Sequence, residues 1–414
     1  MRPQRSNTEA THNAKLCAPP NPKVRLSNPK EPIALPRFVA NFSVPFADWA
    51  ISTYGDESDF VVDPFCGSAT SLLAASSNEI LSLGIELNPA SVVYGRSRLV
   101  PMSKTLERRV ECLVRRSLER NGTTLSDEFL GGFFEELLSS RGNNETAADD
   151  IFAACVLACS RKAFNPKYGM NHSWPKYDRD TEIKIRTSLI KQSLKKCLGH
   201  ARWVSRYYRP ISDAMVVLGD ARNTDSAAKG ASLFLTSPPY LSRLDYIRAT
   251  SPELDYLHHI GAIHDVHQIR KEQIGTVAIP EEFMGHEQSL PQSSCRLLKE
   301  VSNHPSKASK SYYAKFFTNY LSSMNSVFES MTEACRKDAR LVMVVQDSWY
   351  KDIHVPTSSL LKDMLVASGW TLKNEWRYEV TAILSSLNPY SREWKPSKTV
   401  GEYVQAYVRC DNAS

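Results

Sequence analysis

A nine-residue stretch in the middle of the chain, Ser232–Tyr240, combines a predicted strand with residues that could do chemistry; it reads Ser-Leu-Phe-Leu-Thr-Ser-Pro-Pro-Tyr. Its apolar first half predicts a buried strand, and the two prolines stop that strand because they fix φ and remove two backbone donors. The stiff loop therefore presents a hydroxyl, free carbonyl groups and an aromatic ring at the edge where open α/β sheets bind ligands. A strand that simply ends in a rigid turn is the alternative.

The loop suits reaction at an exocyclic amino group of a nucleobase. The lone pair of such a nitrogen is delocalised into the ring, so the nitrogen is a poor nucleophile until acceptors hold both of its hydrogens. The Ser237 hydroxyl and the Pro238 carbonyl are suitable acceptors, and Tyr240 can stack on a base that has left its helix. The candidate catalytic residues are therefore Ser237, Pro238, Pro239 and Tyr240.

A second strand and turn could hold a charged ligand. Residues 60–63 predict a short buried strand that ends in Asp63, and a proline breaks it. A turn with Gly67 and Ser68 follows, and then an apolar helix over 71–76. Strand, turn and helix bring backbone N–H groups together at a helix amino end, where an anionic group binds well. The two small residues allow close approach of a cofactor, and Asp63 could bind a cationic amine.

Two further predicted strands, over 81–86 and 214–220, also end in acids. Glu86 follows Gly67 by 19 positions. In a Rossmann-like fold an acid at about this separation holds the two hydroxyls of a ribose. An exposed loop acid is the alternative. Asp220 is placed to accept a hydrogen bond from the amino group of a purine.

These motifs, taken in order, resemble the S-adenosylmethionine-dependent amino-methyltransferases of DNA. The resemblance rests on Asp-Pro-Phe-Cys-Gly-Ser, Glu86, Asp220 and Thr-Ser-Pro-Pro-Tyr, and it covers about residues 36–100 and 211–409. It implies an α/β fold of the Rossmann-like class I methyltransferase type, with a mostly parallel sheet, one antiparallel strand near the carboxyl end and an added helical insertion. It also implies S-adenosylmethionine as the cofactor, for which the resemblance assigns Phe42, Asp63, Phe65, Gly67, Ser68, Glu86, Asp220, Ala221 and Thr236.

The same resemblance predicts direct methyl transfer to a flipped base of double-stranded DNA, with neither a metal nor a covalent intermediate. A serine before Pro-Pro-Tyr is typical of the cytosine N4 branch, whereas Asp or Asn is usual in the adenine N6 branch, so we favour cytosine. Adenine N6, RNA, or a non-catalytic nucleic-acid-binding subunit with the same fold are the alternatives. A cognate nuclease of a restriction-modification system, or another defence partner, is a possible companion, and the oligomeric state stays open. Ala69 stands where the family more often has glycine.

Two insertions and an amino-terminal arm lie outside the motifs. The predicted units are a flexible arm (1–34), the catalytic domain (35–100, 211–260 and 311–414), a basic helical insertion (101–210) and a polar insertion (261–310). Either insertion could read the target sequence, and the polar one could instead be a lid. Basic residues interleaved with aromatic ones fit phosphate-backbone binding as well as a solvated face. The candidate nucleic-acid residues are Arg202, Trp203, Arg206, Arg243 and Arg392.

Composition is that of an ordinary globular protein. The chain has 414 residues, 42% hydrophobic and 23% charged, with a net charge of +6, which permits a nucleic-acid partner without requiring one. No apolar run approaches the roughly 18 residues of a membrane span. Nine cysteines occur without a Cys-x-x-Cys pair, which favours a reduced, cytoplasmic location over disulfides or zinc. The histidines at 258, 259, 264 and 267 fit a solvated helix end better than a metal site.

Overall fold

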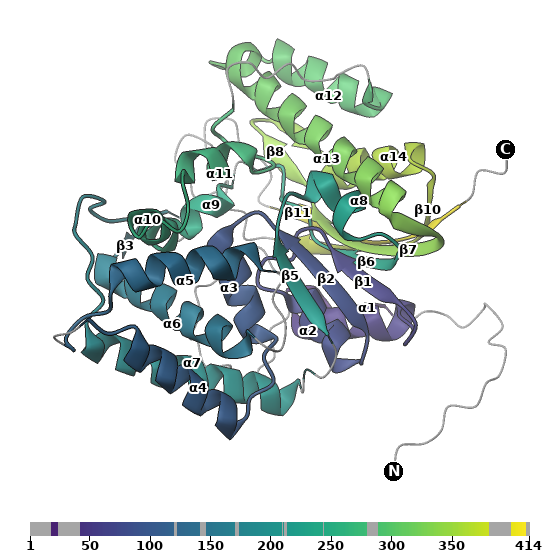
Figure 1. Cartoon of the computed structure of the whole chain (residues 1–414). Helices are drawn as coiled ribbons and strands as arrows, with labels where there is room; N and C mark the ends of the chain where they lie inside the picture. Colours follow the sequence, from purple (N-terminus) through teal and green to yellow (C-terminus); the bar gives the residue numbers. More distant parts are fainter. Residues whose placement is uncertain are drawn as a thin grey trace.

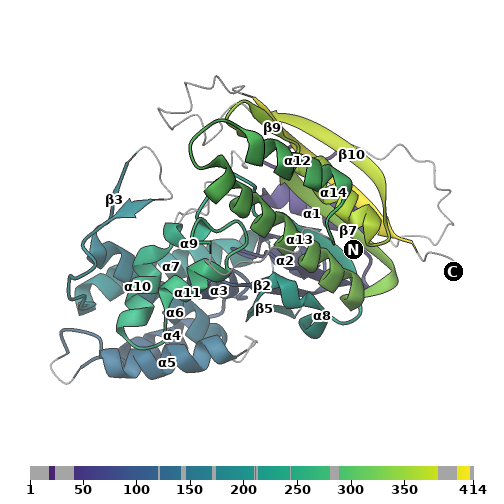
Figure 2. The ribbon, with the colours of Figure 1, turned by 90° about the horizontal axis from the view of Figure 1, so that it is seen from above.

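A twisted central sheet carries helices on both faces, and a block of helices lies beside it (Figures 1 and 2). The computed structural model describes residues 18–23, 42–119, 122–140, 146–169, 174–208, 210, 213–242, 244–279, 289–380 and 399–410. No helix within these ranges is long and apolar enough to cross a membrane. Within the same ranges no group of three or more His, Cys, Asp or Glu side chains could hold a metal ion.

The sheet has seven strands in the order β10-β11-β7-β6-β1-β2-β5. Their bounds are β1 Phe60–Asp63, β2 Leu81–Glu86, β5 Ala214–Leu218, β6 Ala231–Thr236, β7 Cys335–Gln346, β10 Trp370–Val380 and β11 Val400–Arg409. Neighbouring strands from β5 to β7 pair in parallel, whereas β11 runs antiparallel to both β7 and β10. The predicted fold class, a Rossmann-like class I methyltransferase sheet with one antiparallel strand near the carboxyl end, is confirmed.

The strand order reverses between β1 and β6. From β1 the chain moves outward to β2 and β5, and it then returns to β6 on the other side of β1. In open α/β sheets the ligand crevice lies outside the carboxyl ends of the strands at such a switch point. The turn with Gly67 follows β1, and the Pro-Pro-Tyr loop follows β6. The topology therefore places both sequence motifs at one crevice.

Alternate side chains of the strands face two helical layers. Leu233 and Leu235 pack with helices α1 (Val44–Tyr54) and α2 (Thr70–Ser77), whereas Phe234 packs on the opposite face. That second layer consists of α8 (Thr224–Ala227), α12 (Gln292–Asn303), α13 (Ala314–Ala334) and α14 (Thr357–Ala367). Apolar residues of α12 share the core beneath this layer, so part of the predicted polar insertion belongs to the body of the catalytic fold.

The helical block beside the sheet has its own core. It contains α3 (Pro89–Arg98), α4 (Lys104–Arg116), α5 (Asp127–Ser139), α6 (Ala147–Phe164), α7 (Thr187–Tyr207) and α10 (Ser251–His259). Within the insertion, the sequence pattern predicts helices over 105–120 and 182–209, close to α4 and α7, and it predicts neither α5 nor α6. Thirteen of the 18 residues of α6 are buried, so α6 lacks the one-sided apolar stripe by which an amphipathic helix is recognised. A two-stranded ladder of β3 (Lys167–Tyr168) and β4 (Pro175–Lys176) forms between α6 and α7.

Gly84 on β2 lets the turn after β1 pack against the sheet. A Cβ atom at this position would lie 2.6 Å from both Cβ and Sγ of Cys66. Gly84→Ala should therefore destabilise the fold by about 1–3 kcal/mol, because Cys66 is buried in the turn and has little room to move. Thermal unfolding measures the change. Gly132→Ala on α5 is the control, since nothing lies within 4 Å of its Cβ position, and equal melting temperatures for the two variants would contradict the crowding argument.

Candidate active site

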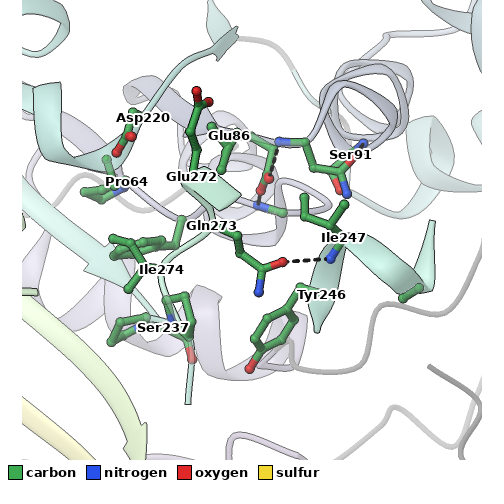
Figure 3. A pocket seen from close by; sticks show the side chains of 18 residues that line it. Pro64, Glu86, Ser91, Asp220, Ser237, Tyr246, Ile247, Glu272, Gln273 and Ile274 are labelled. Carbon is green, nitrogen blue, oxygen red and sulfur yellow. Dashed lines mark hydrogen bonds between the residues drawn. The ribbon is translucent and has the colours of Figure 1, made fainter. Parts of the chain in front are cut away.

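A pocket lies outside the carboxyl ends of β1, β2 and β6, at the switch point (Figure 3). Residues from both sequence motifs line it together. The predicted residues among its walls are Phe65, Gly67, Glu86, Asp220, Ala221, Ser237, Pro238 and Pro239. Residues 170 positions apart in the chain thus form one cavity, as the switch-point argument requires.

Glu86 lines the pocket at the end of β2, where it is half-buried. Its Oε2 accepts a hydrogen bond from the backbone N–H of Gly67 (2.9 Å), and its Oε1 accepts one from the backbone N–H of Asn88 (2.9 Å). Gly67 adopts φ 50°, in the left-handed region that favours glycine. The two backbone donors hold the carboxylate at the end of β2, and burial raises the pKa of Glu86 to about 7. A ligand with two adjacent hydroxyls would meet a preoriented acceptor here.

Asp63 does not line the pocket, and its carboxylate connects the end of β1 with the end of β6 through hydrogen bonds. Its Oδ1 accepts hydrogen bonds from the backbone N–H of Phe65 (3.0 Å) and the hydroxyl of Thr236 (2.7 Å), while Oδ2 accepts from the hydroxyl of Ser71. Burial raises the pKa of Asp63 to about 6. One carboxylate therefore connects the ends of β1 and β6 with the first turn of α2. Neither Asp63 nor Thr236, both predicted to bind the cofactor, lines the pocket.

Two other residues predicted for the cofactor also lie outside the pocket walls. Phe42 is buried beside Phe46 of α1, with 5.4 Å between their ring centroids. Ser68 is buried, and both its carbonyl (2.5 Å) and its hydroxyl (3.0 Å) accept hydrogen bonds from Nη1 of Arg98 on α3. Phe42 thus packs against α1, and Ser68 connects the turn after β1 with α3.

Asp220 lines the pocket with its carboxylate already clamped. Nε of Arg222 donates to both of its oxygens at 3.0 Å, and the backbone N–H of Arg222 donates to Oδ1 at 2.9 Å. Nη2 of Arg222 also donates to the backbone carbonyl of Glu272 (3.0 Å). The clamp orients Asp220 and links it to the facing wall, so a ligand would share this acid with Arg222.

The loop after β6 is held by two tyrosine hydroxyls. Tyr320 of α13 donates to the carbonyl of Pro239 (2.7 Å), and the hydroxyl of Tyr246 accepts from the backbone N–H of Tyr240 (3.1 Å). The Tyr240 hydroxyl donates to Oε1 of Glu402 on β11 (3.0 Å). Burial raises the pKa of Tyr240 well above its usual value, so this hydroxyl stays protonated. The Tyr240 side chain lies beside the pocket, outside the residues that line it.

The facing wall of the pocket was not predicted. It comes from α9 (Tyr246–Ala249) and from the end of α11 (Val266–Glu272) with the residues that follow it. Figure 3 shows Gln273 between Glu86 and Tyr246. The side-chain Oε1 of Gln273 accepts from the backbone N–H of Ile247 (2.9 Å), which joins these two segments. The lining residues of this facing wall are Tyr246, Ile247, Ala249, Glu272, Gln273 and Ile274, and four further lining residues were also not predicted: Pro64, Leu87, Asn88 and Ser91.

The described candidate nucleic-acid residues lie near the carboxyl end of α7, in the helical block. Arg202 is exposed and forms a bidentate ion pair with Glu107 of α4, with both N···O distances 2.6 Å. The rings of Trp203 and Tyr207 contact each other in a tilted arrangement, with 5.0 Å between their centroids, and Arg206 is exposed. None of these side chains lines the pocket. Arg243 and Arg392 lie outside the described residues.

Comparisons with known proteins give a limited result. No protein-family model matches the sequence, and no curated protein matches it. Solved structures that align with the chain include TrmN from Thermus thermophilus, at 8% identity and a TM-score of 0.30, over 88% of this chain and 48% of that one. The chain thus spans about half the length of TrmN.

Two further alignments are similarly distant. The rRNA methyltransferase aviRa from Streptomyces viridochromogenes aligns at 8% identity and a TM-score of 0.30, over 89% of this chain and 86% of that one. A 16S rRNA (adenine(1408)-N(1))-methyltransferase with cosubstrate SAM from Catenulisporales acidiphilia aligns at 11% identity and a TM-score of 0.29, over 89% of this chain and 93% of that one. Scores this low carry no argument about function, and the strand order of the chain itself defines the fold.

Proposed function

We propose that the protein is a methyltransferase that transfers the methyl group of S-adenosylmethionine to the exocyclic amino nitrogen of a flipped DNA base, with cytosine N4 as the acceptor atom. One observation carries the proposal. The acid suited to a ribose, Glu86, and the acceptors suited to an amino group, on Ser237 and Pro238, line one pocket at the switch point of the sheet. Methyl transfer requires a cofactor and an amine side by side, and this pocket provides for both.

The donor set of the pocket fits S-adenosylmethionine. Glu86 presents a half-buried carboxylate for the ribose hydroxyls, and Gly67 offers a turn without a side chain. Phe65, Leu87 and Ile247 supply apolar walls for an adenine ring, with Asp220 at its edge. When bound, the cofactor supplies an electrophilic methyl group. The protein contributes the acceptors that orient the cofactor and the amine.

Acceptor groups on a stiff loop carry the chemistry of this chain. The Ser237 hydroxyl and the Pro238 carbonyl would accept hydrogen bonds from the two N–H groups of the amine, which turns the nitrogen lone pair towards the methyl group. As the nitrogen gains the methyl group it loses one proton to solvent, and S-adenosylhomocysteine is the second product. The hydrogen bond from Tyr320 to the Pro239 carbonyl holds the loop. Preorganised acceptors lower the barrier because they need no rearrangement during the reaction. Tyr240 would stack on the flipped base and offset part of the few kcal/mol that flipping costs.

The direct test is mass spectrometry of nucleosides from DNA incubated with the protein and isotopically labelled S-adenosylmethionine. Labelled N4-methylcytosine is the expected product. Labelled N6-methyladenine would retain the mechanism and overturn the choice of base. No label on DNA, with labelled RNA in a parallel reaction, would replace DNA by RNA as the substrate. Ser237→Ala is the matched variant, because it removes an amino acceptor and leaves Glu86 in place, and it should lose product while retaining the cofactor.

The affinity for the cofactor should depend on pH through Glu86. Its pKa of about 7 means that the carboxylate is charged, and accepts best, above pH 7. Protonation below pH 7 removes acceptor strength, so affinity should fall as the pH falls, by at most about tenfold per pH unit. Calorimetric titrations between pH 5.5 and 8.5 measure this change. Glu86→Gln should bind weakly with a flat profile, and a flat profile in the unsubstituted protein would contradict the assignment.

A further inference from the structure

Part of the amino-terminal arm is docked on the catalytic fold. The carbonyl of Pro19 accepts a hydrogen bond from the Tyr378 hydroxyl of β10 (2.5 Å), and the carbonyl of Pro22 accepts one from the backbone N–H of Ser43 (2.6 Å). Both prolines are buried. The sequence placed residues 18–23 inside a flexible arm, whereas the structure packs them beside the carboxyl end of the sheet.

Lys23 is the last residue of this segment that the structure describes, and its side chain contacts Gln346, Glu402 and Tyr240. Its Nζ donates to Oε1 of Gln346 on β7 (2.8 Å) and lies 3.0 Å from Oε1 of Glu402 on β11. Nζ also lies over the ring of Tyr240, 5.9 Å from its centroid. Gln346 and Glu402 are register partners on adjacent strands, so the ammonium group reaches two strand ends and the loop after β6 at once.

The buried carboxylate of Glu402 requires a positive charge beside it. Its side chain is only 1% exposed, and the Tyr240 hydroxyl donates to the same Oε1 that Lys23 reaches. Oε2 is buried without a hydrogen-bond partner among the described residues. A buried carboxylate is costly unless an opposite charge compensates it. Within the described ranges, Lys23 is the cation that forms an ion pair with Glu402.

We propose that Lys23 is a positioning residue of the active site. It compensates the charge of Glu402, Glu402 in turn holds the hydroxyl of Tyr240, and the ring is thereby fixed for stacking on the target base. A charged acceptor gives a stronger hydrogen bond to the hydroxyl than a neutral one. The role of the ring rests on the proposed function, whereas the pairing of Lys23 with Glu402 does not. The amino-terminal segment is thus a component of the catalytic site.

Thermal unfolding tests the pair without any assumption about the substrate. Lys23→Met should lower the melting temperature by about 5 °C, because it leaves Glu402 buried without a counter-charge. Glu402→Gln keeps an acceptor for Tyr240 and removes the charge. In a Glu402→Gln background, Lys23→Met should therefore leave the melting temperature roughly unchanged. An equal fall of the melting temperature in both backgrounds would overturn the pairing of Lys23 with Glu402.

Kinetics then test the effect on the site. With Glu402 present, Lys23→Met should lower the turnover of methylated DNA by about tenfold while the dissociation constant of S-adenosylmethionine stays unchanged. In the Glu402→Gln background, the same replacement should change turnover less than about twofold. Lys299→Met, at an exposed position on α12, is the control for loss of a lysine charge.

The outcomes separate the positioning role from its rivals. A tenfold loss in both backgrounds would mean that Lys23 contacts the substrate itself, and it would overturn the positioning role. If the unsubstituted protein methylates no nucleic acid, the proposed function fails, and the unfolding cycle still decides whether Lys23 and Glu402 are coupled.

Discussion

Tyr240→Ala should lower the turnover of DNA by about 10- to 100-fold and change the affinity for S-adenosylmethionine by less than about twofold. Base stacking on an aromatic ring contributes about 1–3 kcal/mol, which corresponds to this range of rates. The Tyr240 side chain lies beside the pocket and away from Glu86, so cofactor contacts should survive its removal. Single-turnover methylation of DNA and calorimetric titration of the cofactor measure the two effects separately.

Tyr240→Phe is the matched control for this prediction. It keeps the ring and removes the hydroxyl, together with its hydrogen bonds to Glu402 and to the Ser237 side chain. Turnover should therefore lie between those of the unsubstituted protein and the alanine variant. Should Tyr240→Ala remain folded and lose cofactor binding and turnover together, the ring would belong to the cofactor site and the stacking role would be wrong.

Glu86→Ala should weaken S-adenosylmethionine binding by about 100-fold or more. Each hydrogen bond to a charged group contributes roughly 1.5–3 kcal/mol, and a ribose would make two of them. The replacement also removes the acceptor for the backbone N–H groups of Gly67 and Asn88, which loosens the turn around the ligand. Calorimetric titration checks the affinity, and steady-state kinetics should show the loss mainly in the KM of the cofactor.

The control for that variant is Glu333→Ala, which removes an exposed acid on α13. It should bind the cofactor as the unsubstituted protein does. Near-normal binding by a folded Glu86→Ala protein would refute the ribose assignment and would direct attention to Asp220, the other acid at a strand end in this pocket.

Local sequence patterns predicted the centre of the fold well. The strands at 60–63 and 81–86 have the predicted bounds, because each is a short, mostly apolar run with a polar or turn-forming residue on either side. The shared crevice followed only once the strand order was known, because the ends of β1 and β6 meet at the switch point. The sequence did not distinguish residues that line the pocket from residues that support it. Asp63 accepts hydrogen bonds from Ser71 and Thr236, and only the folded chain shows these partners.

The unpredicted parts of the site depend on contacts between distant segments. Gln273 lies in a polar stretch without a helical or strand period, and its place in the wall comes from its bond to Ile247. Lys23 follows a proline-rich sequence that is typical of a flexible arm. Its position depends on Gln346 and Glu402, which are far away in the chain. Periodicity and composition report on neighbours in sequence, so they contain no information about such contacts.

The hydrogen bond between Thr236 and Asp63 has a consequence for folding during synthesis on the ribosome. The two residues are 173 positions apart, and Lys23 and Gln346 are 323 positions apart. The turn with Gly67 is therefore synthesised long before the loop and the strand ends that complete its site. Such long-range closure is slow compared with local folding. A nascent chain that stops before β6 holds half of the residues that line the pocket, and the contacts of Lys23 form only after β7 and β11 have been made.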